Sequence, residues 1–180
     1  MHARDYVSPR QRKLTEDEKE TRNIAYGLKT GEIEAVKTAA AEMAALIAGR
    51  ENVILIPVPD SKGDTGANMK LCRGICDVLG EGRASIIDIL KRSEPVASQC
   101  MLRRQGKTVR YTVAQHKIYA DIVFCKMLSA MCIEDGATLA YVDNVLTTGS
   151  TINACISATC IGGDALVFAR AFETCRKGGM

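Results

Sequence analysis

Residues 139–151 read Leu139-Ala140-Tyr141-Val142-Asp143-Asn144-Val145-Leu146-Thr147-Thr148-Gly149-Ser150-Thr151, and this stretch decides the fold class. An apolar run from Leu139 to Val142 ends in two polar residues. A loop of small residues follows, and a helical pattern begins near Ile152. A strand, a polar tip, a small-residue loop and a helix start, in this order, are the layout of a phosphate site in an α/β protein.

The loop Thr147–Thr151 has the chemistry that such a site needs. Gly149 lets the backbone turn where a Cβ would clash. Free N–H groups at the helix start point at one place, and the helix dipole favours an anion there. The loop hydroxyls add donors, and Asp143 is able to accept from sugar hydroxyls. Ordinary turns and helix caps use the same residue types, but the acid ahead of the loop favours a site for a phosphorylated ribose.

Residues 142–151 resemble the motif for 5-phosphoribosyl 1-pyrophosphate (PRPP) of the type I phosphoribosyltransferases. That motif is a hydrophobic strand, two acids, two variable residues, then Thr-Gly and small hydroxyl residues. The chain matches it everywhere except at Asn144, where the family usually has Asp or Glu.

Two further segments resemble the ComF-like branch of this family, and the likeness covers roughly residues 50–172. The apolar run 53–59 ends in Pro-Val-Pro, and Gly66-Ala67-Asn68 is similar to a Gly-Phe-Asn element that follows it there. Residues 91–99 carry a similar Arg…Pro…Gln stretch, with Arg92, Pro95 and Gln99. The zinc-binding Cys cluster that often precedes ComF-like domains is absent.

The resemblance implies a phosphoribosyltransferase that uses PRPP and Mg²⁺, with an unidentified base or other nitrogen compound as acceptor. Thr147, Thr148, Gly149, Ser150 and Thr151 would hold the 5′-phosphate, and Asp143 and Asn144 would be the catalytic pair beside the ribose. Asp60, Ser61, Lys62 and Gly63 would form the pyrophosphate loop, with backbone N–H groups facing the leaving group. Mg²⁺ would be held through PRPP, with Asp143 as the one candidate protein ligand. Arg103 and Arg104 would belong to a mobile basic loop that closes over the site.

Asn144 leaves two functions open. An amide offers hydrogen bonds but no charge beside the developing cation. The first interpretation is therefore an enzyme in which residue 144 gives the transition state less electrostatic stabilisation than a carboxylate would. The second is a non-catalytic PRPP or nucleotide sensor, linked through its ComF likeness to DNA uptake or nucleic acid.

Between Lys91 and Lys117 lie Arg92, Arg103, Arg104, Lys107 and Arg110 against the single acid Glu94. This segment reads as a solvated loop, as a nucleic-acid footprint, or as a basic loop facing a polyphosphate. Sparse aromatic residues weaken the nucleic-acid interpretation, and the neighbouring motif favours the polyphosphate.

Composition excludes several classes of protein. The 180 residues suit one domain, and the net charge of +3 says little about partners. No apolar run is long enough to span a bilayer, and the N-terminus has no apolar signal-peptide core. The eight Cys lie largely in apolar helical patterns, which predicts reduced thiols. We therefore expect a cytoplasmic protein without a membrane partner, and a homodimer stays open.

Strand and helix patterns alternate along the chain. Strands are expected over 53–58, 85–90, 138–142 and 165–171, and helices over 31–48, 68–79, 113–131 and 150–160. Residues 1–22 read as an arm or short helix. Near-continuous apolar strands predict a single α/β domain over residues 31–180, with a mainly parallel central sheet flanked by helices. Residues 1–30 would form an N-terminal arm or hood.

Overall fold

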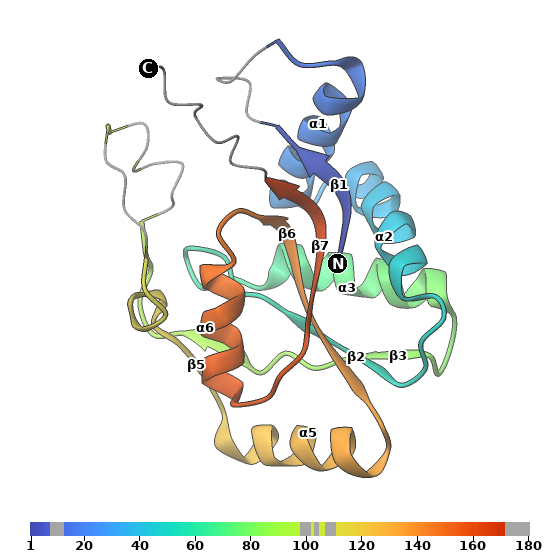
Figure 1. The fold of residues 1–180 in the computed structure, drawn as a ribbon, viewed down its shortest axis with the longest axis vertical. Helices are drawn as coiled ribbons and strands as arrows, with labels where there is room; N and C mark the ends of the chain where they lie inside the picture. The colour runs from blue at the N-terminus through green and yellow to red at the C-terminus, as the bar shows by residue number, and fades with distance from the viewer. Residues whose placement is uncertain (8–12, 98–101, 103–104, 107–110, 172–180) are drawn as a thin grey trace, which may run out of the picture.

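A computed structural model describes residues 1–7, 13–97, 102, 105–106 and 111–171. Its centre is a five-stranded parallel sheet in the order β1-β7-β6-β2-β3, which confirms the predicted α/β class (Figure 1). The strands are β1 (His2–Tyr6), β2 (Val53–Pro57), β3 (Ala84–Ile86), β6 (Thr138–Leu146) and β7 (Asp164–Ala171).

Helices cover both faces of this sheet, as the near-continuous apolar strands require. One core packs α1 (Glu16–Thr30), α2 (Ile33–Ile47) and α3 (Gly66–Leu79) against alternate residues of β2, β6 and β7. The other packs α5 (Ile122–Glu134) and α6 (Ser150–Thr159) against the opposite residues of β2 and β6. The alternation is regular: Leu55 and Val142 face the first core, and Ile54 and Tyr141 face the second.

The neighbouring strands β2 and β6 position the candidate site. β2 continues through α3 to β3 on one side, whereas β6 continues through α6 to β7 on the other. Adjacent strands whose connections leave in opposite directions form a topological switch point, and ligands of open α/β sheets bind beyond the carboxyl ends of such strands. The N–H of Val58 donates to the carbonyl of Val142 at 3.0 Å, so the two strands stay paired up to this edge.

A small antiparallel sheet stands beside the main one. β4 (Leu90–Arg92) pairs with β5 (Ile118–Ala120), and a 3-10 turn, η1 (Ala114–His116), precedes β5. This ribbon carries both ends of the basic segment 91–117.

Three sequence expectations differ from the structure. Residues 2–6 form an edge strand rather than an arm. The single strand expected over 85–90 is divided between β3 and β4, which belong to different sheets. The helix expected from residue 113 begins only at Ile122, because Lys117 has a left-handed backbone (φ 52°) and Asp121 caps the helix by accepting from the N–H groups of Val123 and Phe124.

Within the described residues, no helix combines the length and the apolar character needed to cross a bilayer.

The six described cysteines are free thiols; Cys72, Cys125 and Cys155 are buried. Cys100 and Cys175 lie outside the described residues.

Candidate functional site

Gly149 shapes the loop at the start of α6. It is the N-cap residue and has a left-handed backbone with φ 75°, a conformation that glycine adopts without strain. Gly149 has no side chain to cap the helix, and in the first turn the N–H of Ser150 donates to Oγ1 of Thr148 at 3.4 Å. The hydroxyls of Thr148 and Ser150 lie 3.0 Å apart.

A small hollow brings the predicted phosphate and ribose residues together. Asp143 and all five loop residues, Thr147 through Thr151, line it, with Val145, Leu146 and Ile152 completing the wall. Residues of the strand end and of the helix start therefore face one space, as the motif predicts.

Asp143 is half-buried in the carboxyl-terminal half of β6, one residue beyond the last pair that β6 makes with β2. Its Oδ1 accepts from the N–H of Asn144 at 2.8 Å and lies 3.4 Å from the Nδ2 of Asn68. Burial raises the pKa of Asp143 to about 6, although these two bonds and the charge of Lys29 oppose the shift. Carboxyl groups whose pKa is raised by burial at the edge of a hollow are common at functional sites.

Asn68 links this carboxyl to the neighbouring strand. Its side chain is buried, and the same Nδ2 donates to the carbonyl of Val58 at 2.7 Å. Asn144, the second member of the expected pair, turns its Oδ1 to the N–H of Val145 at 2.7 Å. One acceptor of the Asn144 amide is thus used within its own strand.

The expected pyrophosphate loop is closed on itself. Oδ1 of Asp60 accepts from the N–H groups of Lys62 and Asp64 at 2.8 and 2.9 Å, and the N–H of Gly63 donates to the Asp60 carbonyl at 3.1 Å. The carbonyl of Ser61 accepts from the N–H of Val96 at 2.8 Å. The N–H groups of Lys62 and Gly63 therefore have partners inside the loop, while the Lys62 side chain is exposed.

Arg92 and His116 join the two loops, and sequence reasoning gave neither a role of this kind. The guanidinium of Arg92 donates to the carbonyls of Asp60 at 3.0 Å and Pro59 at 3.5 Å, and to that of His116. The imidazole Nε2 of His116 lies 3.0 Å from Oγ of Ser150. The sequence signals were that Arg92 falls in the Arg…Pro…Gln stretch and in the basic segment 91–117; nothing local connects it to the side chain of residue 116.

The remaining predictions concern the lid and the metal. Arg103 and Arg104 lie outside the described residues. Among the described residues, no group of three His, Cys, Asp or Glu side chains is placed to hold a metal ion. Of the described carboxylates, Asp143 is the one that borders the hollow.

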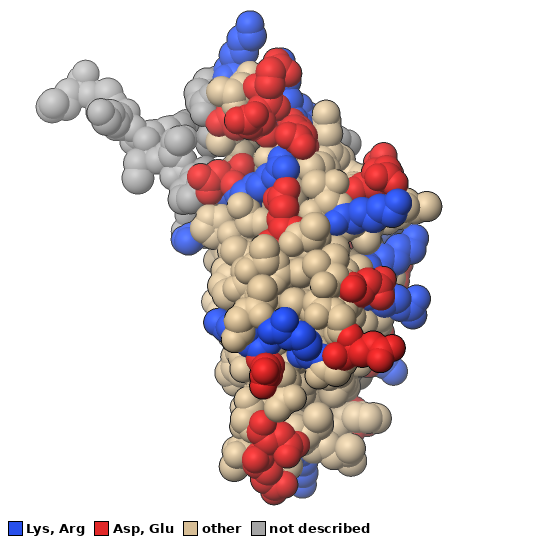
Figure 2. Space-filling model, turned by 90° about the vertical axis from the view of Figure 1, so that its right-hand side faces the viewer, with Lys and Arg blue, Asp and Glu red and all other residues tan. Residues whose placement is uncertain are grey.

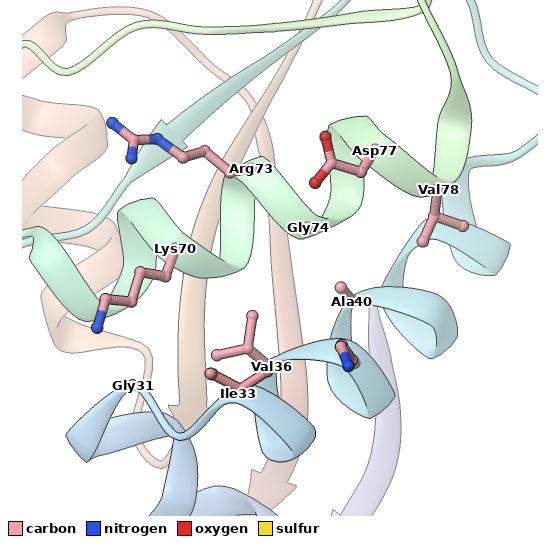
Figure 3. Close-up of a pocket in the computed structure, with 10 residues that line it drawn as sticks. Gly31, Ile33, Val36, Ala40, Lys70, Arg73, Gly74, Asp77 and Val78 are labelled. Atoms are coloured by element: carbon pink, nitrogen blue, oxygen red, sulfur yellow. The ribbon is translucent and has the colours of Figure 1, made fainter.

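A larger groove lies between α2 and α3 (Figure 3), and it shares no lining residue with the hollow. Its volume is about 380 Å³; Ile33, Val36, Ala40, Gly74 and Val78 make it apolar, with Lys70, Arg73 and Asp77 at its edge. It has no convergent polar groups of the kind that orient a substrate. The face shown in Figure 2 mixes basic and acidic side chains, so the described residues on it present no extended basic stripe for nucleic acid.

Compared with known protein families and with curated proteins, the chain matches none.

Proposed function

We propose that this protein binds PRPP with Mg²⁺ and transfers its phosphoribosyl group to a nitrogen acceptor, using a fold of the type I phosphoribosyltransferase kind. One observation carries the proposal: Asp143 and the loop Thr147–Thr151 line one hollow at the switch point of a parallel sheet. The hollow itself is small, about 20 Å³, but the helix N-terminus on one side of it and the carboxylate on the other are groups that bind a phosphate and sugar hydroxyls.

The residues divide the ligand between them. The first-turn N–H groups of α6 and the hydroxyls of Thr148 and Ser150 would bind the 5′-phosphate, and Asp143 would accept from the ribose hydroxyls. Lys62, on the neighbouring loop, would face the pyrophosphate. When bound, Mg²⁺ would neutralise part of the pyrophosphate charge.

In the transfer, the bond between C1 of ribose and the pyrophosphate oxygen breaks, and both electrons leave with pyrophosphate. The lone pair of the acceptor nitrogen forms the new C1–N bond, and the proton lost from that nitrogen passes to solvent. Positive charge builds on the ribose ring, so a carboxylate beside it stabilises the transition state more than the ground state. Asp143, with its pKa of about 6, is mostly ionised at neutral pH and supplies that charge.

A second function is favoured by two observations. Asn144 brings no charge to the ribose, and the loop 60–63 uses its N–H groups internally. Both features are compatible with a protein that binds PRPP or a nucleotide as a sensor and does not catalyse a reaction.

Binding and turnover are measured separately. Titration calorimetry with PRPP and with nucleotides, each with Mg²⁺, tests binding, and Gly149→Val is the negative control. No heat from the unmodified protein with any of these ligands at millimolar concentration would rule out both functions. Pyrophosphate release with a panel of nitrogen bases then separates enzyme from sensor.

Asn144→Asp sharpens this comparison. If the missing charge limits catalysis, the variant should release pyrophosphate faster with little change in PRPP affinity. Turnover of about 1–1000 per second with Asn in place would instead show that this amide does not limit the enzyme.

A further inference from the structure

His116 occupies an unusual position beside the phosphate loop. It is only 4% exposed, although it lies at the end of the short 3-10 turn η1, just before β5 of the two-stranded ribbon. Nε2 lies 3.0 Å from Oγ of Ser150, the first residue of α6, which is 34 positions away in the sequence. Among the described residues, Nδ1 is buried without a hydrogen-bond partner.

Several contacts fix the imidazole in place. The ring packs edge-on against Tyr111, with centroids 5.5 Å apart, and the Tyr111 hydroxyl donates to the carbonyl of Ala97 at 2.9 Å. The backbone carbonyl of His116 accepts from Arg92, which also donates to the carbonyl of Asp60. The imidazole is therefore held from the side of the pyrophosphate loop while it contacts the phosphate loop.

The two neutral tautomers have opposite consequences for Ser150. With the proton on Nδ1, a buried N–H would have no acceptor, which is rare in folded proteins. The Ser150 hydroxyl would then donate to Nε2 and be lost to a ligand. With the proton on Nε2, the imidazole donates to Oγ of Ser150, and the serine proton is free to donate elsewhere. Burial and the charge of Arg92 lower the pKa of His116, which favours a neutral ring at pH 7.

We propose that His116 is a positioning residue that donates from Nε2 to Ser150 and so leaves the Ser150 hydroxyl proton free to donate to a phosphate in the loop. Ser150 has two neighbours in this network, His116 and the Thr148 hydroxyl, both at 3.0 Å. Once His116 occupies a lone pair of Ser150 Oγ, the remaining proton points to Thr148 or to the hollow. An anion that only accepts hydrogen bonds completes this arrangement. The inference rests on the proposed phosphate site, but it does not require phosphoribosyl transfer.

The binding experiment measures the affinity for ribose 5-phosphate and for inorganic phosphate by calorimetry. His116→Leu removes the donor from the buried position, and His116→Gln keeps an N–H near the position of Nε2. We expect the Leu variant to bind about tenfold more weakly, which corresponds to about 1.4 kcal/mol, and the Gln variant to stay within about threefold. In a Ser150→Ala background, His116→Leu should have no further effect, because its action passes through that hydroxyl.

A spectroscopic measurement on the unmodified protein covers the case in which the Leu variant fails to fold. The chain has only two histidines, so long-range proton–nitrogen NMR assigns His116 by comparison with the Gln variant. We expect a protonated Nε2, an unprotonated Nδ1, and a shift of the Nε2 resonance in Ser150→Ala. A proton on Nδ1, or equal losses from His116→Leu with and without Ser150, overturns the inference.

The outcomes keep this inference apart from the proposed function. Phosphate binding that depends on His116, in a protein that neither binds PRPP nor releases pyrophosphate, supports the inference and refutes the function. PRPP turnover with unchanged phosphate affinity in His116→Leu does the reverse. A protein that binds no phosphate compound contradicts both.

Discussion

In the carboxyl-terminal half of β6, burial works against the charge of Asp143. The carboxyl gains two hydrogen bonds and an attraction to Lys29, yet its pKa is raised to about 6. Desolvation thus outweighs the local partners, so the ionised carboxylate lowers the stability of the folded protein.

Replacing Asp143 by Asn should therefore stabilise the protein in a pH-dependent way. Because the folded-state pKa is raised, the folded protein binds the extra proton, and the stability of the unmodified protein falls as pH rises from about 4 to about 6. Above pH 6, Asp143→Asn should raise the free energy of unfolding by about 1–3 kcal/mol, and near pH 4 by little. Urea unfolding at both pH values, in the presence of a chelator, measures the difference.

The exposed Asp77→Asn on α3 is the matched control and should not reproduce this change.

The same Asp143 variant should lose about 1.5–3 kcal/mol of affinity for ribose ligands while inorganic phosphate still binds. Equal losses for both ligands would mean that Asp143 only holds the loop together.

Gly149 is needed for its backbone and not for space. An added Cβ would meet only Leu146 at 3.8 Å, an ordinary contact, but φ is +75°. Gly149→Ala should cost about 1–2 kcal/mol of stability from left-handed strain, and Gly149→Val more, with loss of phosphate binding. Gly162→Ala, where the Cβ meets open space, is the control. Urea unfolding measures the stability of these variants, and calorimetry measures their phosphate binding. A Gly149→Ala variant as stable as the unmodified protein would contradict the prediction.

At the scale of the element, the loop 60–63 shows how one side chain shapes a backbone. The carboxyl of Asp60 replaces bonds that a turn of this size cannot make for itself. Its conformation is therefore set by Asp60 from within and by Arg92 and Val96 from outside.

Removing this carboxyl should open the loop. In Asp60→Ala, the amides of Lys62 and Asp64 should exchange with solvent at least about tenfold faster, because local opening then breaks fewer bonds. Asp60→Asn keeps an acceptor oxygen and should exchange nearly as the unmodified protein does. NMR-detected hydrogen exchange compares the three proteins; unchanged protection in the Ala variant would assign the closure to Arg92 instead.

For the whole molecule, Arg4 joins elements that are distant in the sequence. From β1 it binds Glu42 of α2 through two nitrogens at 2.5–3.0 Å and Glu20 of α1 at 3.4 Å, and it lies 5.8 Å from the Phe168 ring centroid of β7. The carboxylates raise the pKa of Arg4. This one side chain connects the edge strand to two helices.

Arg4→Met should lower the free energy of unfolding by about 1–3 kcal/mol, because it leaves the half-buried Glu42 without its bidentate partner. Lys19→Met, which removes an exposed pair with Glu16, should cost less than about 0.5 kcal/mol. Chemical denaturation of both variants decides the matter, and equal small effects would mean that β1 is held by its strand pairing alone.

Elements with a local signature were predictable from the sequence. The apolar periodicities of α2, α3 and α6 and the continuous apolar runs of β2 and β7 predicted elements that the structure confirms. The order of strand, acid, loop and helix start around Asp143 likewise lies within a dozen or so consecutive residues, so the lining of the hollow could be predicted.

The remaining features depend on contacts between segments that are distant in the sequence. β1 has a polar sequence and becomes a strand because β7 offers it a pairing edge, while residues 85–90 divide between two sheets because their partners do. The chain of contacts from Asp60 through Arg92 and His116 to Ser150 joins residues 24 to 34 positions apart. Strand pairing and such side-chain contacts depend on which segments meet in space, and no periodicity of a single segment carries that information.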